Sequence, residues 1–206
     1  MPFLVDIKAN RKYHHRQKAV CISRDRIVSD HAISTSKVKS QRRHILKSIT
    51  SKIDIHSKPK TVWENVTNVK IEQYSDPLLF KIWGIPKPLK AEVISVGEGG
   101  QRIAYFDSGK RFIQTITTWK PLREYSFDFN PEKGFIVGHF FDLSDGVFQV
   151  PSGTYLLTER KGVTTLQLST TYSLDKRVYF LFNLPVRLIL KAFQRYLLRS
   201  IKKNSE

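Results

Sequence analysis

Four tyrosines and one glutamine lie in strand-like segments where their polar groups could meet a bound molecule. Tyr105, Tyr125, Tyr155 and Tyr172, together with Gln114, interrupt otherwise apolar faces. A phenolic hydroxyl turned into a protein interior needs a hydrogen-bond partner, which a protein group, water or a ligand can supply. These side chains could therefore orient a ligand, or act as acid–base groups in an enzyme.

Other patterns that carry chemistry are weak. The chain has no carboxylate pair at a defined spacing, no Gly-x-Ser-x-Gly motif and no cluster of metal-ligating residues. His139 lies in an irregular stretch, and it is the one histidine that we weigh as a catalytic candidate. The run Gly97-Glu98-Gly99-Gly100 favours a hairpin turn over a phosphate loop, since a strand follows at once. We therefore predict no catalytic residue, no metal and no cofactor.

The composition predicts one soluble domain, with some residues outside its core. The 206 residues are 40% hydrophobic and 12% aromatic, which is enough for one core. A single cysteine, Cys21, excludes an internal disulfide and fits a cytoplasmic location. We expect neither a secretory signal nor a membrane-spanning helix, because residues 178–198, the longest apolar candidate, contain Pro185, Arg187 and Lys191.

The net charge of +17 is unevenly distributed. Residues 1–49 carry 12 lysines and arginines against 3 acidic residues, residues 50–175 carry 15 against 14, and residues 176–206 carry 8 against 1. A groove for nucleic acid would place its basic residues within the domain's own strands and loops. We therefore predict no specific nucleic acid partner, and a basic, poorly ordered extension over residues 1–48.

The periodicity of residues 49–206 predicts an α+β domain. Residues 49–56 alternate as a half-buried strand, and Pro59 then opens a helix with Val62, Trp63 and Val66 on its apolar face. A second short helix is expected to run from Lys70 or Glu72 to Trp83. Further strands are predicted over residues 91–96, 102–107, 111–119, 124–129, 153–160 and 163–173, with residues 135–151 irregular.

A long helix is predicted over residues 176–203, with two different faces. Arg187, Lys191, Arg195 and Arg199 recur every four residues as a basic ridge. The opposite face is apolar and would pack on the sheet. Ile189, Phe193 and Leu197 belong to that face, and we predict that they contact the same ligand as the tyrosines and Gln114.

Four stretches, taken in order, resemble a known superfamily. They are residues 53–63, with Pro59 and Val62-Trp63; residues 109–121, a strand ending in Trp119-Lys120-Pro121; the hairpin of residues 153–166; and Tyr172 with the closing helix through residues 197–202. This pattern is similar to the START/polyketide-cyclase (SRPBCC) superfamily and covers residues 49–206. The resemblance implies a helix-grip fold, in which a curved antiparallel sheet wraps around a long C-terminal helix and two short helices follow the first strand.

The same resemblance implies an internal cavity for lipids, polyketides or other apolar molecules. Our first hypothesis is therefore that the protein binds a hydrophobic small molecule or lipid without catalysis. One alternative is a cyclase/dehydratase-like enzyme that uses cavity tyrosines. The other is a basic interaction protein for RNA, the ribosome or an anionic membrane surface, with which peripheral contact would be compatible.

Overall fold

The computed structural model describes residues 43–71, 78–139, 141–144 and 146–206, so residues 1–42 of the predicted extension lie outside it. Residues 43–206 form one compact unit. Its elements follow one another as β1 (His44–Ile55), α2 (Pro59–Thr67), β2 (Val69–Lys70), α3 (Leu78–Trp83), β3 (Pro88–Val93), β4 (Gln101–Phe106), β5 (Arg111–Lys120), β6 (Glu124–Pro131), β7 (Ile136–Val137), β8 (Phe141–Asp142), β9 (Phe148–Arg160), β10 (Val163–Asp175) and α4 (Lys176–Ser205).

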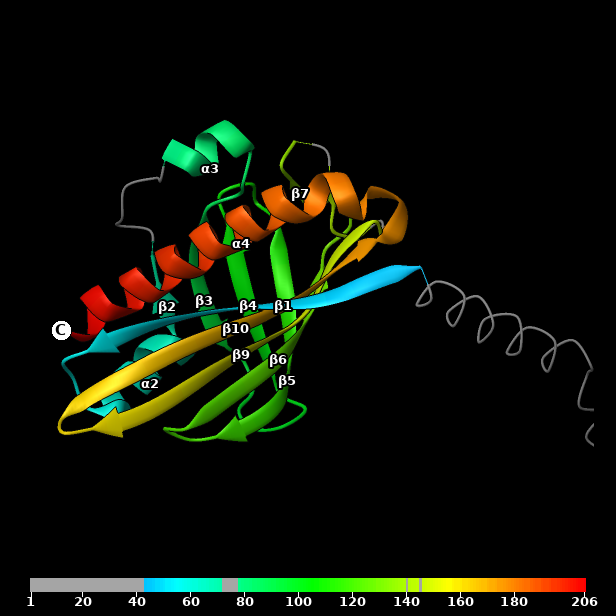
Figure 1. The fold of residues 1–206 in the computed structure, drawn as a ribbon. Helices are drawn as coiled ribbons and strands as arrows, with labels where there is room; N and C mark the ends of the chain where they lie inside the picture. Colours follow the sequence, from blue (N-terminus) through cyan, green and yellow to red (C-terminus); the bar gives the residue numbers. More distant parts are fainter. Residues whose placement is uncertain (1–42, 72–77, 140, 145) are drawn as a thin grey trace, which may run out of the picture. The chain divides into compact units, whose positions relative to one another are not determined.

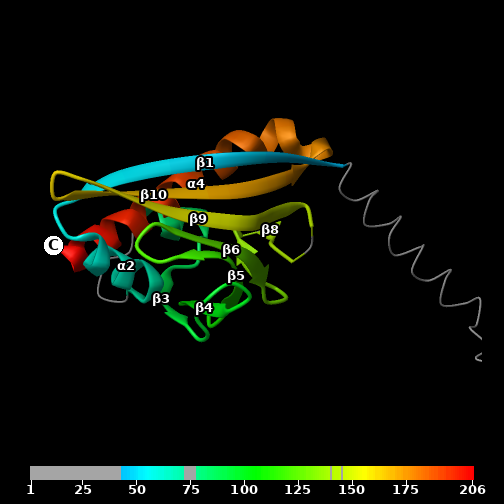
Figure 2. The same ribbon diagram turned by 90° about the horizontal axis from the view of Figure 1, so that it is seen from below.

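Eight of the strands form one antiparallel sheet in the order β1-β10-β9-β6-β5-β4-β3-β2, while β7 pairs with β8. The first strand pairs with the last over its whole length, with His44 opposite Asp175 and Ile55 opposite Thr164. The sheet is strongly curved, and α4 lies along its concave side (Figure 1). The view from below shows the curvature most clearly, with α2 at one end of the sheet (Figure 2). This is the predicted α+β helix-grip architecture.

The short helix α2 closes one end of the core. Pro59 occupies its first turn, where a missing N–H costs no hydrogen bond. Val62, Trp63 and Val66 are buried, as their spacing predicted. The Trp63 ring meets the Trp119 ring edge-on, with 5.1 Å between their centroids. This helix therefore packs through aromatic contacts with the sheet.

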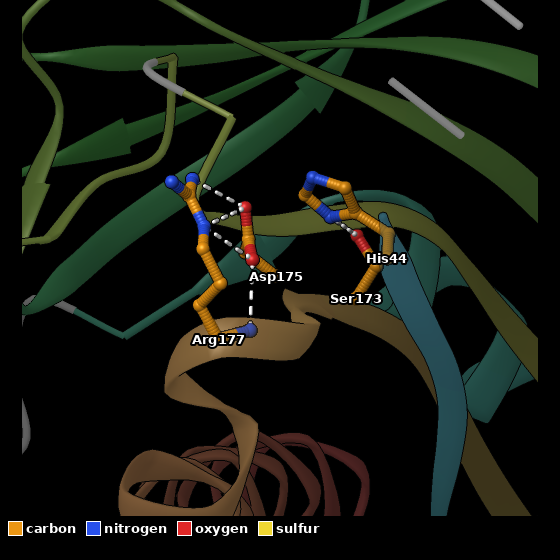
Figure 3. Close-up of polar contacts among 4 residues, drawn as sticks. All are labelled: His44, Ser173, Asp175 and Arg177. Atoms are coloured by element: carbon orange, nitrogen blue, oxygen red, sulfur yellow. Dashed lines mark hydrogen bonds and ion pairs between the residues drawn. The ribbon is translucent and has the colours of Figure 1, made fainter. Parts of the chain in front are cut away.

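The long helix α4 begins at a cap built from the end of β10 (Figure 3). The Asp175 carboxylate accepts a hydrogen bond from the Arg177 backbone N–H at 2.9 Å and pairs with the Arg177 guanidinium at 2.8 Å. These hydrogen bonds hold the pKa of Asp175 well below its usual range. Beside the cap, His44 Nδ1 lies 3.3 Å from Ser173 Oγ and links β1 to β10. The helix then continues through Pro185 to Ser205.

Several predicted boundaries need correction. β1 begins at His44 rather than Ile49, and β3 begins at Pro88 and ends at Val93 rather than running from 91 to 96. Val69 and Lys70 pair with β3 as a short strand at the point where a helix was expected to begin. Residues 135–151, which we predicted to be irregular, contain β7, β8 and the first residues of β9, which begins at Phe148. Within the described residues, no helix is both long and apolar enough to cross a bilayer.

Candidate ligand-binding site

A cavity of about 110 Å³ lies between the sheet and α4. Strands β2 to β6, β9 and β10 line it, together with α4 and the loops around Pro86, Phe135 and Leu143. Most of the lining side chains are apolar. An engineered apolar cavity of roughly 150 Å³ admits benzene, so this volume is close to that of one aromatic ring or a short alkyl chain.

Phenylalanine rings form one wall of the cavity. Phe106, Phe112 and Phe135 lie against one another with ring centroids 4.2 to 5.0 Å apart. Phe127 and Phe129 meet edge-on at 5.0 Å on the neighbouring strand β6. Each ring is held by the next, and the wall therefore has a defined shape. Phe135 was not predicted to contact a ligand, because it lies outside the periodic segments.

Five of the eight predicted ligand-binding residues line this cavity. Gln114 comes from β5, Tyr155 from β9, and Ile189, Phe193 and Leu197 from α4. The structure thus brings together side chains that are up to 83 positions apart, as Gln114 and Leu197 are. Their contact with a ligand remains a prediction.

The other three predicted residues do not line the cavity. Tyr105 lies on the outer face of β4, with the Lys90 ammonium 5.1 Å from its ring centroid, because Arg102, Ala104 and Phe106 take the inward positions. We expected Tyr105 to point into the cavity, and this expectation was wrong, because the inward positions of β4 are those of its neighbours Ala104 and Phe106. Tyr172 is buried near the start of α4, where its hydroxyl donates to Asn183 Oδ1 at 2.8 Å.

Tyr125 is fully buried behind the cavity wall. Its ring stacks on Tyr155 at 6.3 Å and lies 5.7 Å from the Arg102 guanidinium carbon. Among the residues that the structure describes, no group meets the full distance and angle requirements of a hydrogen bond with its hydroxyl, although the Arg102 guanidinium is close enough to lower its pKa. Burial raises the pKa of Tyr125 to about 12, although the nearby Arg102 charge opposes the rise. Tyr125 is therefore a neutral structural group in the core.

The sequence reasoning missed four polar residues of the cavity lining: Lys90, Arg102, Thr170 and Gln194. Gln194 of α4 donates to the Ile49 carbonyl at 3.0 Å and to Thr170 Oγ1 at 2.8 Å, and its Oε1 accepts from Ser51 at 2.8 Å. These hydrogen bonds therefore link α4 to β1 and β10. Arg102 is the buried charged residue of the four, and it is only 3% exposed.

The guanidinium of Arg102 is held by three neutral oxygens. Nε donates to the Thr67 carbonyl at 3.2 Å, Nη2 to the Val66 carbonyl at 2.9 Å, and Nη1 to Gln114 Oε1 at 3.0 Å. The first two acceptors belong to the C-terminal turn of α2, whose end carries about half a negative charge. The cavity wall thus contains a fixed, buried positive charge beside Gln114 and Tyr155.

The lining offers hydrogen-bond donors rather than bases. Its described residues include no aspartate, glutamate or histidine. Burial raises the pKa of Tyr155 and keeps its phenol protonated at neutral pH, so that it can donate a hydrogen bond but not accept a proton. His139 is exposed and lies against Gly84, outside the cavity lining. In the described part of the chain, no three His, Cys, Asp or Glu side chains are grouped to hold a metal ion.

A second, more open hollow of about 530 Å³ lies next to the cavity. Phe112, Phe129, Leu143 and Val150 line both spaces. Asp128 and Gln149 also line the hollow.

No family model and no curated protein sequence matches the chain. Solved structures do. Truncated norcoclaurine synthase from Thalictrum flavum is 12% identical, with 78% of this chain and 93% of that chain covered and a TM-score of 0.51. The structure of Ara h 8.0201 is 12% identical over 77% of this chain and 97% of that chain, with a TM-score of 0.49. A protein from Arthrobacter aurescens is 14% identical over 76% and 86%, with a TM-score of 0.48. At these identities the likeness concerns the fold alone, and the chain therefore has the helix-grip fold that its sequence resembles.

Proposed function

We propose that the protein binds a small hydrophobic molecule in the cavity between the sheet and α4. The observation that carries this proposal is an apolar space of about 110 Å³ inside an otherwise packed core. Protein interiors are close-packed, and an unfilled space forfeits dispersion contacts that a ligand would restore. The volume is below the roughly 300–1,000 Å³ of sites for drug-sized ligands, so it favours a single-ring or short-chain molecule over a whole lipid.

Binding is favoured over catalysis by the lining of the site. Norcoclaurine synthase, an enzyme by name, shares the fold. In this chain, however, the described cavity residues supply two cations, Arg102 and Lys90, together with two side-chain amides, the Thr170 hydroxyl and the neutral Tyr155 phenol, and they include no carboxylate or imidazole to take a proton. These groups can orient a ligand, and the apolar walls can hold it.

Filling the cavity tests the proposal. Ala104 lines the cavity and is 8% exposed, so Ala104→Leu would occupy ligand volume. Ile113→Phe is the matched control, because Ile113 lies on the neighbouring strand and is 37% exposed, outside the cavity lining. We expect toluene or indole to raise the melting temperature of the wild type and of the control, but not of Ala104→Leu. A wild type that no apolar probe stabilises, and from which solvent extraction and mass spectrometry recover no apolar molecule, would refute the proposal.

A second proposal, peripheral contact with an anionic membrane, rests on the exposed face of α4. Phe180 is 93% exposed, and Leu181, Leu184 and Leu188 are 53% to 69% exposed. Positions 180, 184 and 188 share one face of the helix, and the exposed ridge of Arg187, Lys191, Arg195 and Arg199 continues along it. Apolar side chains beside basic ones are typical of helices that lie in the interface of an anionic bilayer.

Vesicle sedimentation distinguishes this surface from general attraction by a basic protein. We expect binding to vesicles of phosphatidylcholine with phosphatidylserine, and a large loss of binding in the double variant Phe180→Ser, Leu184→Ser. Val96→Ser is the control, since Val96 is 72% exposed in a hairpin loop of the sheet. If the double variant and the control bind equally well, the apolar residues of α4 have no part in membrane contact.

A further inference from the structure

Arg102 carries a charge that the described protein does not neutralise. Its side chain is 3% exposed, and a guanidinium stays protonated at any physiological pH. It forms no ion pair with any carboxylate in the described residues; its acceptors are the Thr67 and Val66 carbonyls and the amide oxygen of Gln114. Burying a charge without a counter-charge costs several kcal/mol, so the arrangement needs an explanation.

Two features compensate for part of this charge. The Val66 and Thr67 carbonyls end α2, which supplies about half a negative charge at that point. The Tyr125 ring lies 5.7 Å from the guanidinium carbon, at a distance where the ring attracts a cation. Both features hold the side chain in place, but neither supplies a full negative charge.

Arg102 lines the cavity and has more N–H groups than it has protein acceptors at hydrogen-bond distance. A guanidinium has five N–H groups, and three of them have protein acceptors, which leaves one on each Nη nitrogen. The amide nitrogen of Gln114 and the hydroxyl of Tyr155 make no hydrogen bond within the described residues, and both residues line the cavity. At this place the wall therefore presents the N–H groups of Gln114 and the hydroxyl of Tyr155 beside a positive charge.

We propose that the natural ligand is a small apolar acid, whose carboxylate binds Arg102 with Gln114 and Tyr155 as further donors. The inference rests on the proposed function, because it assumes that the apolar cavity is where the ligand binds. A planar carboxylate accepts two parallel hydrogen bonds from a guanidinium, and its single negative charge matches the single positive charge of Arg102. The phenylalanine wall would hold the ring or chain of the acid, within a volume of about 110 Å³.

A matched pair of ligands tests the charge. We expect benzoate to bind the wild type about tenfold or more tightly than benzamide, which has nearly the same shape without the charge, as measured by calorimetric titration. Measurements in 0.5 M NaCl separate the site from the basic surface, because a buried pair is screened far less than an exposed one. Equal affinity for acid and amide, or binding of neither, overturns this inference alone, whereas the proposed function fails only if toluene and indole do not stabilise the protein and extraction recovers no apolar molecule.

Two variants locate the effect at Arg102. Gln114→Glu keeps the shape of the side chain and supplies an internal carboxylate 3.0 Å from the guanidinium, so we expect it to fold normally, to bind benzamide and to lose the preference for benzoate. Arg102→Met removes the charge and, in protein that remains folded, should lose the same preference. Gln114→Glu is the main test, because Arg102→Met also leaves the carbonyls at the end of α2 without their donor. If Gln114→Glu still prefers benzoate tenfold, the acid binds elsewhere and the inference is wrong.

Discussion

Gly153 of β9 occupies a position where the core leaves no room for a side chain. A β-carbon placed there would lie 2.7 Å from Phe127, which is the paired residue on β6 and a member of the cavity wall. We expect Gly153→Ala to lower the free energy of unfolding by about 1–3 kcal/mol, because it overpacks a buried site. Gly162→Ala is not a suitable control, since Gly162 has a positive φ of 79° and would be strained for that reason alone. Denaturant unfolding measures the change, and an unchanged midpoint would show that Phe127 moves aside without cost.

Asp175 makes stability depend on pH through its role as a helix cap. Asp175→Ala should cost about 1 kcal/mol, whereas Asp175→Asn keeps a capping oxygen and loses only the charge. The folded-state pKa of Asp175 is lowered by Arg177, so its ionic contribution is complete above the unfolded pKa of about 3.9 and is lost as the pH falls below it. Thermal melts from pH 7 to pH 2 should therefore show the wild type losing its advantage over Asp175→Asn below pH 4. A constant difference across that range would contradict this assignment.

At the scale of single residues, the sequence predicted apolar positions better than charged ones. Ile189, Phe193 and Leu197 lie on the predicted apolar face of α4 and line the cavity, because helical spacing fixes which side of α4 they occupy. Arg102 was missed because an arginine at the start of a strand is usually exposed. The sequence nevertheless contained a signal for its burial. Arg102, Ala104 and Phe106 occupy alternate positions of β4 and therefore share its inner face, which places Tyr105 on the outer face.

At the scale of the elements, the packing of α2 on the sheet depends on the side chain of Trp63. Trp63 is 8% exposed and packs against Trp119 and Tyr125, with ring centroids 5.1 and 6.4 Å away. Trp63→Ala should reduce the free energy of unfolding by roughly 3–5 kcal/mol, the range for removing a large core aromatic residue. A loss below about 1 kcal/mol in urea denaturation would mean that α2 is not fixed to the sheet through this ring.

Long elements could be predicted from periodicity, and short ones could not. Periods of two and of 3.6 residues are visible over the lengths of β6, β10 and α4, and the structure confirms these elements. β2, β7 and β8 have two residues each and are defined by a pairing partner, which no local pattern reveals. The predicted start of α4 at Lys176 is confirmed, and the Asp175 side chain caps the helix there, nine residues before Pro185.

The compact unit of the whole molecule begins at Arg43, which predicts how the chain tolerates truncation. Residues 43–206 contain the complete sheet and α4, and the Arg43 carbonyl accepts from the Lys176 backbone N–H at 2.8 Å. A protein that starts at Arg43 should therefore melt within a few degrees of the full chain, in one cooperative transition by calorimetry. A protein that starts at Ile49 is the contrasting variant, since it lacks the first five residues of β1 and should be less stable. If the first truncation already broadens the transition, residues 1–42 support the fold.

The pairing of β1 with β10 has a consequence for synthesis of the chain on the ribosome. β1 is an edge strand whose one neighbour in the sheet is β10. Ile49, for example, pairs with Thr170, which is synthesised 121 positions later. The growing chain therefore exposes an unpaired strand for most of translation, and it cannot complete the sheet until nearly all of the sequence has left the exit tunnel. Nascent chains that stall before β10 should be substrates for chaperones and prone to aggregation, whereas release of the finished chain should allow β1, β10 and α4 to assemble together.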